Sequence, residues 1–163
     1  VDNLSVIVLA NVGHQRLGAR VATEEVVAPI LAESGLQVPS QVKLAFSPER
    51  VDPGNATYGI TNTPKVVGGL DEASSAAARD FYSRFCDTVV VAKGAREAEL
   101  AKLLENTYRH VNIALINELA ILSHELDIDV WDAIRCAATK PFGFQAFYPG
   151  PGVGGHCIPI DPN

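Results

Sequence analysis

A cysteine follows a glycine- and proline-rich stretch near the end of this 163-residue sequence. Residues 147–161 read FYPGPGVGGHCIPID, so Cys157 and Asp161 lie four residues apart. Glycines let backbone amides approach a ligand closely, and a thiolate is a strong nucleophile. The pattern therefore fits a nucleophilic Cys157 with Asp161 nearby for proton handling. A buried cysteine beside a tight turn fits the same residues, and composition alone slightly favours that structural alternative.

Three glycines of this stretch also satisfy the pattern G-x-G-x-x-G, at Gly150, Gly152 and Gly155. A dinucleotide-binding fingerprint needs a strand before it and a helix after it. No strand pattern precedes Gly150, and Pro159 prevents a helix from opening on the loop. The stretch is therefore not interpreted as an NAD-binding loop, and no residue is assigned to cofactor binding.

A stretch without proline or glycine carries a second group of candidates. Lys102 and Asn106 are spaced i and i+4, so they share one face of a helix, and Glu99 and Arg109 extend that face. A lysine and an amide that point the same way can stabilise a developing oxyanion. Such a polar stripe is more often solvated surface, and taken alone this one favours that alternative.

A carboxylate after a buried strand is the third candidate. Glu49 follows the apolar run 42–46 (VKLAF). Strand ends in α/β sheets often face a ligand crevice, although many such carboxylates merely meet water. A cysteine hydrolase that pairs Cys157 with His156 is the least favoured reading, because adjacent residues rarely aim their side chains at each other. No metal site is expected, since the remaining histidines show no ligand spacing with the cysteines; they are His14, His110 and His124.

The elements that would position these residues change character along the chain. Strand patterns at 4–9, 42–46, 65–67 and 88–92 alternate with helix patterns at 22–34 and 71–85, where Pro29 suggests a kink and Gly35 an end. The apolar spacing over 95–126 then predicts one long helix, and Asp129 can cap another over 130–138. The sequence therefore predicts an α/β part (1–93) with a partial parallel, Rossmann-like sheet, joined to an all-α part (94–163).

Composition bounds the class of protein. Hydrophobic residues make up 47% and charged residues 20%, as in soluble globular proteins. The net charge of −6 argues against a nucleic-acid partner, and no apolar run approaches the length that spans a membrane. Three widely spaced cysteines show no disulfide framework, so a cytoplasmic location is expected.

Four stretches together resemble the UDP-glucose/GDP-mannose dehydrogenase family. Their residues are more similar to those of the branch that acts on UDP-N-acetylhexosamines than to those of the UDP-glucose branch. Matches of this length, in the family's order and at its spacing, are highly specific. They are SPERVDPGN at 47–55, PKVVGG at 64–69, EAELAKLLENTYRHVNIALINELA at 97–120 and FYPGPGVGGHCIPIDP at 147–162.

The resemblance implies oxidation of a sugar 6-hydroxyl group to a carboxylate in two steps, with two NAD. Cys157 matches the thiolate that adds to the intermediate aldehyde and then carries a thioester. Lys102 and Asn106 match the pair that stabilises oxyanions. Asp161 matches the carboxylate that works with water and the lysine, and Glu49 the general base for thioester hydrolysis. The residues that would line the UDP-sugar pocket are Arg50, Tyr148, Gly152 and Gly154.

The sequence also departs from the family. The family's glycine-rich NAD fingerprint and its second α/β domain have no counterpart here, so we expect a central piece that is inactive alone, with the main NAD motif outside it. Residues 10–21 (ANVGHQRLGARV) stand where the family has Ser-Thr-Val-x-Pro-Gly-Thr. The family's long helix forms its dimer core, which implies a homodimer through 95–126. The alternative is a dimerisation remnant of the family that has lost its chemistry.

Overall fold

The computed structural model describes residues 22–52 and 54–154. The strand expected at 4–9 and the divergent stretch 10–21 lie outside the described residues. The chain divides into two compact units, residues 1–103 and 104–163. The division falls inside the long helix α3 (Ala95–Glu125), which therefore supplies residues to both units.

The first described helix is interrupted where the sequence predicted a kink. A π-helical turn, η2 (Thr23–Val27), leads directly into α1 (Ala28–Glu33), with Pro29 in the first turn of α1. Proline lacks an N–H, so the regular i to i−4 bond is lost there, and such places often widen to π geometry. The helix ends at Gly35, which has a positive φ of 85° and whose amide donates to the Ala32 carbonyl at 3.0 Å.

A three-stranded sheet forms the centre of the first unit, in the order β1 (Ala45–Phe46), β2 (Lys65–Gly69), β3 (Val89–Val91). Strands β2 and β3 are parallel and are joined through α2 (Glu72–Tyr82), as predicted for an α/β unit. Strand β1 is antiparallel to β2, so the sheet is mixed rather than wholly parallel. No helix connects β1 to β2 in residues 47–52 and 54–64, and the chain returns through a loop in the opposite direction.

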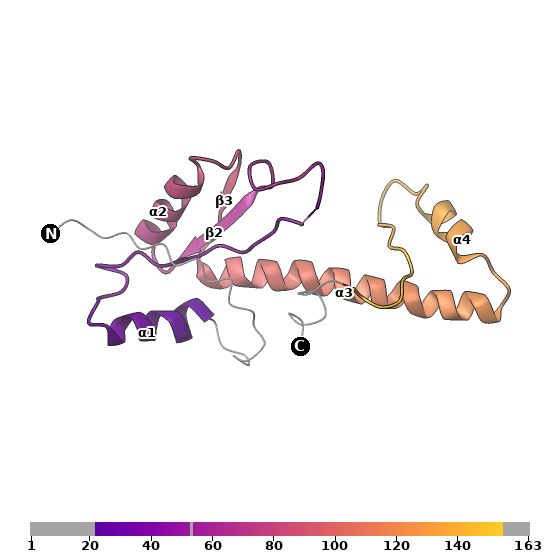
Figure 1. Ribbon diagram of the computed structural model, residues 1–163, viewed down its shortest axis with the longest axis horizontal. Coiled ribbons are helices and arrows are strands. Elements are labelled where there is room, and N and C mark those ends of the chain that lie inside the picture. Colours follow the sequence, from indigo (N-terminus) through magenta and orange to yellow (C-terminus); the bar gives the residue numbers. More distant parts are fainter. Residues whose placement is uncertain (1–21, 53, 155–163) are drawn as a thin grey trace. The chain divides into compact units, whose positions relative to one another are not determined.

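The two faces of β2 pack against different helices. On one face Val67 and Ala45 pack with Ala78 and Tyr82 of α2, which lies alongside β2 and β3 in Figure 1. On the other face Val66 packs with Phe46 and with Ala95 and Ala98 of α3. Alternate residues of the strand thus fill two cores, which is the period-2 pattern of a sheet covered on both sides.

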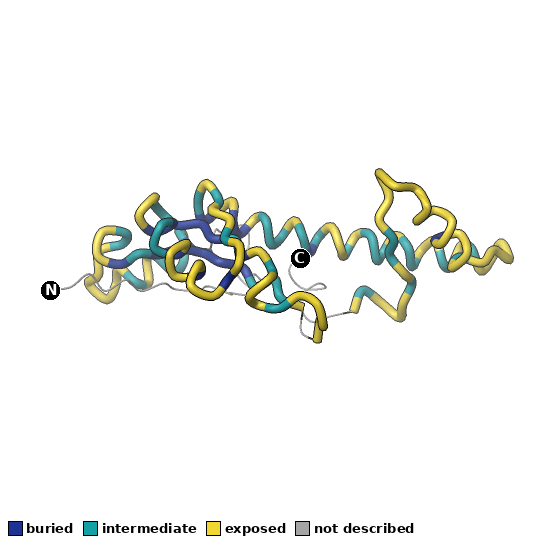
Figure 2. The backbone as a smooth tube through the Cα atoms, turned by 90° about the horizontal axis from the view of Figure 1, so that it is seen from above, coloured by how far each residue is buried: buried dark blue, intermediate teal, exposed yellow. Residues whose placement is uncertain are grey.

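The second unit consists of helical structure followed by an irregular segment. Helix α3 agrees with the helix predicted over 95–126, and α4 (Val130–Ala137) begins after Asp129 as predicted. The Asp129 carboxylate accepts from the Trp131 and Asp132 amides at 2.9 and 3.2 Å. Buried positions gather in the first unit, whereas in 104–154 only Asn106 and Ile134 are buried (Figure 2). Of the helices described, none combines the length and apolar character that a membrane crossing requires.

Candidate functional site

The segment that carries Glu49 is fastened to strand β2. Glu49 itself is half-buried, and its Oε1 accepts from the Val51 amide at 2.7 Å. The residues on either side of it are held by side-chain hydrogen bonds to backbone carbonyls, so the backbone that carries the carboxylate is fixed. These bonds are Ser47 Oγ to Val66 O at 2.8 Å, Lys65 Nζ to Pro48 O at 3.0 Å, and Arg50 Nη1 to Pro64 O at 2.7 Å.

Lys65 is a buried cation next to this segment, and sequence reasoning did not single it out. Its side chain is 7% exposed, and its Nζ lies 5.2 Å from the centroid of the Tyr82 ring. Burial raises the pKa of the Tyr82 hydroxyl and of the Cys86 thiol, although the Lys65 ammonium draws the Cys86 pKa downward. Cys86 is therefore a protonated, structural thiol at neutral pH, and its Sγ donates to the Ile60 carbonyl at 3.4 Å.

Lys102 and Asn106 lie one turn apart on α3, so the spacing that placed them on one helix face holds in the structure. Asn106 is 2% exposed and Lys102 is half-buried, whereas Arg109 is exposed. A solvated surface stripe does not describe this face, because its amide is enclosed. Buried amides in proteins are held in place by their partners, which makes Asn106 suited to act as a fixed donor.

The spacing of Glu99 suggested that it extends the polar face of Lys102 and Asn106 into solvent. In the structure Glu99 is buried instead. Its side chain is 5% exposed and turns to the N-terminus of the helix that starts at Thr23. One carboxylate oxygen accepts from the Ala22 amide at 3.0 Å, and the other accepts from the Thr23 amide at 2.9 Å. No side chain of the N-cap residue serves this helix end, so a residue of α3 provides the missing acceptors.

The irregular segment that contains Tyr148 and Gly152 lies against α3 and α4. The Tyr148 ring is stacked on Trp131 of α4, with 6.0 Å between centroids and 16° between ring planes. Gly150 donates its amide proton to Asn117 Oδ1 of α3 at 2.9 Å. Gly154 has a positive φ of 69°, a conformation that favours glycine, as a glycine-rich turn requires.

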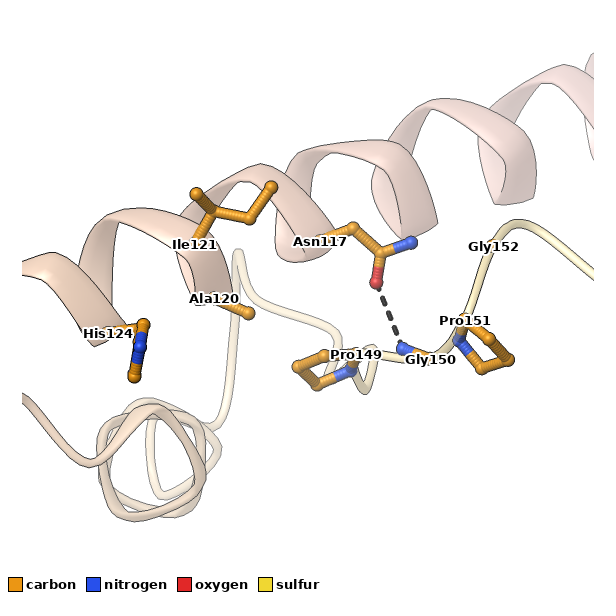
Figure 3. Close-up of a pocket in the computed structure, with 8 residues that line it drawn as sticks. All are labelled: Asn117, Ala120, Ile121, His124, Pro149, Gly150, Pro151 and Gly152. Atoms are coloured by element: carbon orange, nitrogen blue, oxygen red, sulfur yellow. Dashed lines mark hydrogen bonds between the residues drawn. The ribbon is translucent and has the colours of Figure 1, made fainter.

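An open groove of about 540 Å³ runs between this segment and α3 within the second unit (Figure 3). Its lining is mostly apolar, with the Asn117 amide and the His124 ring as polar side chains. Gly152 is part of its wall, while Tyr148 is not. The lining residues are Asn117, Ala120, Ile121, His124, Pro149, Gly150, Pro151 and Gly152.

The candidate residues fall on separate parts of the chain. Glu49, Arg50 and Lys102 belong to the first unit, and Asn106 and the segment 148–154 belong to the second. Cys157 and Asp161 lie outside the described residues. Their roles, and those of the other candidates, therefore stay predictions.

The junction of β2 with α2 does not offer the phosphate cradle that NAD needs. Glycines do lie between a strand and a helix where β2 meets α2, but their space is taken by the chain itself. A Cβ on Gly68 would come within 2.0 Å of the Gly94 carbonyl oxygen, and one on Gly69 within 2.3 Å of the Ser75 amide nitrogen. The helix start is occupied by Asp71, whose carboxylate accepts from the Ser74 amide at 2.7 Å. An anion would find no room there.

A metal centre is not built from the residues that the structure describes. Across 22–52 and 54–154 no group of three histidine, cysteine, aspartate or glutamate side chains could hold a metal ion. In the same ranges Cys86 is a buried free thiol and Cys136 an exposed one.

Comparison with known proteins identifies the family. The NAD binding domain model of the UDP-glucose/GDP-mannose dehydrogenase family matches residues 19–86, and the central domain model of the same family matches residues 96–163. The chain belongs to this family, which confirms the resemblance seen in its motifs. The two matches are separated by residues 87–95, whereas the compact units divide within α3.

Relatives with known names cover most of this chain. UDP-N-acetyl-D-mannosamine dehydrogenase of Methanococcus aeolicus is 42% identical over 140 residues, 86% of this chain and 31% of that protein. Solved structures of UDP-D-ManNAc dehydrogenase from Pyrococcus horikoshii (36% identity, TM-score 0.78) and of UDP-N-acetyl-mannosamine dehydrogenase from Staphylococcus aureus (37% identity, TM-score 0.76) each match 86% of this chain. The chain spans 33% and 34% of those two proteins.

Proposed function

We propose that this chain is the part of a UDP-sugar 6-dehydrogenase that carries the catalytic thiol, Cys157. The 42% identity to a UDP-N-acetyl-D-mannosamine dehydrogenase is the observation that carries the proposal. The substrate is a UDP-N-acetylhexosamine, and the product is the corresponding uronic acid. Because the chain spans 31% of that relative, activity belongs to a protein that also supplies the remaining segments.

NAD, the cofactor that the family's first domain is named for, would accept the hydrides of both oxidations. The residues of this chain act on the sugar. The Cys157 thiolate attacks the aldehyde carbon, forming a C–S bond, and Lys102 and Asn106 stabilise the oxyanion that results. Asp161 works with water and the lysine. Loss of the second hydride from the carbon of this adduct leaves a thioester on Cys157. In the last step water attacks the thioester carbonyl, Glu49 takes the water proton, and the thiolate leaves.

Two structural observations support these roles. The enclosed Asn106 amide and the half-buried Lys102 are held on one helix, so donors for an oxyanion would already be in place. Glu49 sits on a backbone that hydrogen bonds fix to β2, which suits a base that must meet a water molecule in a set geometry. Arg50 of the same segment and the segment 148–154 would line the UDP-sugar pocket.

A homodimer through α3 is part of the proposal. Large apolar side chains 42% to 66% exposed run along the helix, and their spacing repeats every 11 residues. Such a repeat keeps one stripe on one side of a nearly straight helix, and its exposed side chains fit burial against a second copy. Tyr108 of the stripe also contacts Phe147 of its own chain. The stripe consists of Leu100, Leu104, Tyr108, Val111, Leu115, Leu119, Leu122 and Leu126.

A cytoplasmic location also belongs to the proposal. Cys86 and Cys136 are both free thiols, in keeping with a reducing compartment.

A segment exchange tests the proposed activity. Residues 22–163 replace the matching segment of the Methanococcus aeolicus relative, which supplies the flanking parts. The chimera is assayed for NADH formation at 340 nm with UDP-N-acetylmannosamine. We expect turnover with two NADH formed per sugar, because a primary alcohol becomes a carboxylate. The chain alone is assayed in parallel and is expected to show none.

The matched controls are Cys157→Ser, which is expected to abolish uronic acid formation, and Cys136→Ser, which is expected to leave it unchanged. A chimera that folds and binds NAD but does not oxidise the sugar would contradict the proposal and favour a dimerisation remnant. Unchanged turnover in Cys157→Ser would contradict the role of the thiol.

A further inference from the structure

The segment 144–152 forms no helix or strand, yet side chains of α3 and α4 hold it within the second unit. Tyr108 contributes twice: its hydroxyl donates to Gln145 Oε1 at 3.1 Å, and its ring meets the Phe147 ring edge-on at 5.9 Å between centroids. The Trp131–Tyr148 stack then follows one residue later. These contacts place the aromatic half of the segment.

A hydrogen bond joins the Pro149-Gly150-Pro151 part of the segment to α3. Proline has no N–H, so in Pro149-Gly150-Pro151 the amide of Gly150 is the single backbone donor. That donor points at Asn117 Oδ1 on α3, at 2.9 Å (Figure 3). The Asn117 side-chain oxygen therefore accepts from the only backbone donor of the tripeptide Pro149-Gly150-Pro151.

We propose that Asn117 is a positioning residue that docks the Pro149–Gly152 turn on α3 and keeps Tyr148 in place before any substrate binds. The inference rests on the proposed function, in which Tyr148 and Gly152 line the UDP-sugar pocket. A segment docked in advance loses less conformational entropy when its ligand arrives. It also fixes the chain four to five residues before the glycines that lead to Cys157.

Trp131 makes the docking measurable, because it is the only tryptophan in the sequence. Trp131 is 56% exposed and Tyr148 is 60% exposed, so a change in the stack changes how easily a quencher reaches the indole. Acrylamide quenching of fluorescence therefore reports on the Tyr148 end of the segment. Amide exchange at Gly150, followed by NMR, reports on the Asn117 end.

The test uses the full 163-residue chain without substrate or cofactor. Asn117→Ala removes the acceptor, Asn117→Gln displaces its oxygen by one methylene, and Asn117→Asp keeps an oxygen at the same place. In the Ala and Gln variants we expect Gly150 to exchange roughly two- to tenfold faster, the range for loss of one net hydrogen bond. Acrylamide quenching of Trp131 in these variants should approach the quenching measured in Tyr148→Ala, in which the indole has lost its stacking partner. Asn117→Asp should restore both readings.

Asn112→Ala is the matched control. Its side chain donates to the Tyr108 carbonyl of its own helix at 2.7 Å, so its loss should leave Gly150 exchange unchanged. The inference is overturned if Gly150 exchange and Trp131 quenching in Asn117→Ala and Asn117→Gln equal those of the parent chain, or if Asn117→Asp fails to restore them. Asn117→Gln keeps a side-chain amide of similar polarity, so it carries the test if the Ala variant does not fold. A chimera without turnover but with normal docking would count against the proposed function alone.

Discussion

Thr23 donates two hydrogen bonds to one carboxylate oxygen of Glu99, from its backbone amide at 2.9 Å and from its hydroxyl at 2.5 Å. The two residues are 76 positions apart, and Thr23 falls in the match to the family's NAD binding domain while Glu99 falls in the match to its central domain. A buried acid on the first turns of α3 therefore ties the two family segments together. Lys102 lies one turn further along the same helix.

Glu99→Ala should destabilise the chain by about 1 to 3 kcal/mol, because it leaves buried donors of Ala22 and Thr23 without an acceptor. Urea unfolding followed by circular dichroism measures the change. Glu97→Ala, at an exposed position two residues earlier, is the matched control and should stay close to the parent. Equal stability of the two variants would show that the Glu99 contacts contribute nothing.

Stability should fall at alkaline pH. Burial raises the pKa of Tyr82 and of Cys86 in the folded chain above the ordinary values of 10.0 and 9.0. Between the unfolded and folded pKa the native chain holds more protons than the unfolded chain, so unfolding free energy decreases as pH rises. The two protonated groups make their full contribution to the free energy of unfolding below about pH 8, and this contribution is lost as the pH rises further.

Urea midpoints between pH 7.5 and 10.5 test this alkaline loss. Tyr82→Phe and Cys86→Ala each remove one titrating group, so each should flatten the curve relative to the parent. A parent midpoint that does not move over this range, or that rises, contradicts the assignment of these two groups as buried and neutral.

Charge placed on the apolar stripe of α3 should break the proposed homodimer. Leu115 is 55% exposed, and a glutamate there would have to be buried against the second copy. Leu115→Glu is therefore expected to sediment as a monomer where the parent sediments as a dimer. Ile121→Glu changes a side chain that is 58% exposed and off the stripe, so it should remain dimeric. A parent chain that is monomeric at high concentration contradicts the interface.

The helices of this fold could be predicted from local sequence, whereas the tertiary contacts that hold them in place could not. Absence of proline and glycine over α3 and the capping Asp129 before α4 are local signals, and both elements appear as predicted. The direction of β1 is not local, since alternation of apolar residues is the same in parallel and antiparallel pairs. The predicted parallel pairing therefore holds for β2 and β3, whereas the antiparallel direction of β1 was not predicted.

The same limit applies to the candidate site. The spacing of Lys102 and Asn106 predicted one helix face, and the helix bears that out. The contacts of Lys65 and Asn117 were not predicted, because their partners, Pro48 and Gly150, lie 17 and 33 residues away. Both residues do stand inside stretches that resemble the family, at 64–69 and 97–120, which is the one signal that could have pointed to them.

Lys102→Met should lower kcat of the chimera by roughly 100- to 1000-fold, the usual effect of removing an oxyanion donor. KM for the UDP-sugar should change little if the ammonium acts mainly on the transition state. Lys93→Met removes an exposed lysine shortly before α3 and serves as the control with unchanged kcat. A loss confined to KM would place Lys102 in substrate binding rather than in oxyanion stabilisation.

Thiol reactivity tests the central claim most directly, because it asks whether Cys157 is a poised nucleophile. The full chain is treated with iodoacetamide at pH 6, and labelling of each cysteine is followed by peptide mass spectrometry. A thiolate near a lysine should persist at this pH, whereas Cys86 is a buried thiol with a raised pKa. Cys136 is an exposed free thiol and serves as the reference for access of the reagent. We expect Cys157 to be labelled well before both. Equal labelling of Cys157 and Cys136, or faster labelling of Cys136, would contradict a catalytic thiol at Cys157.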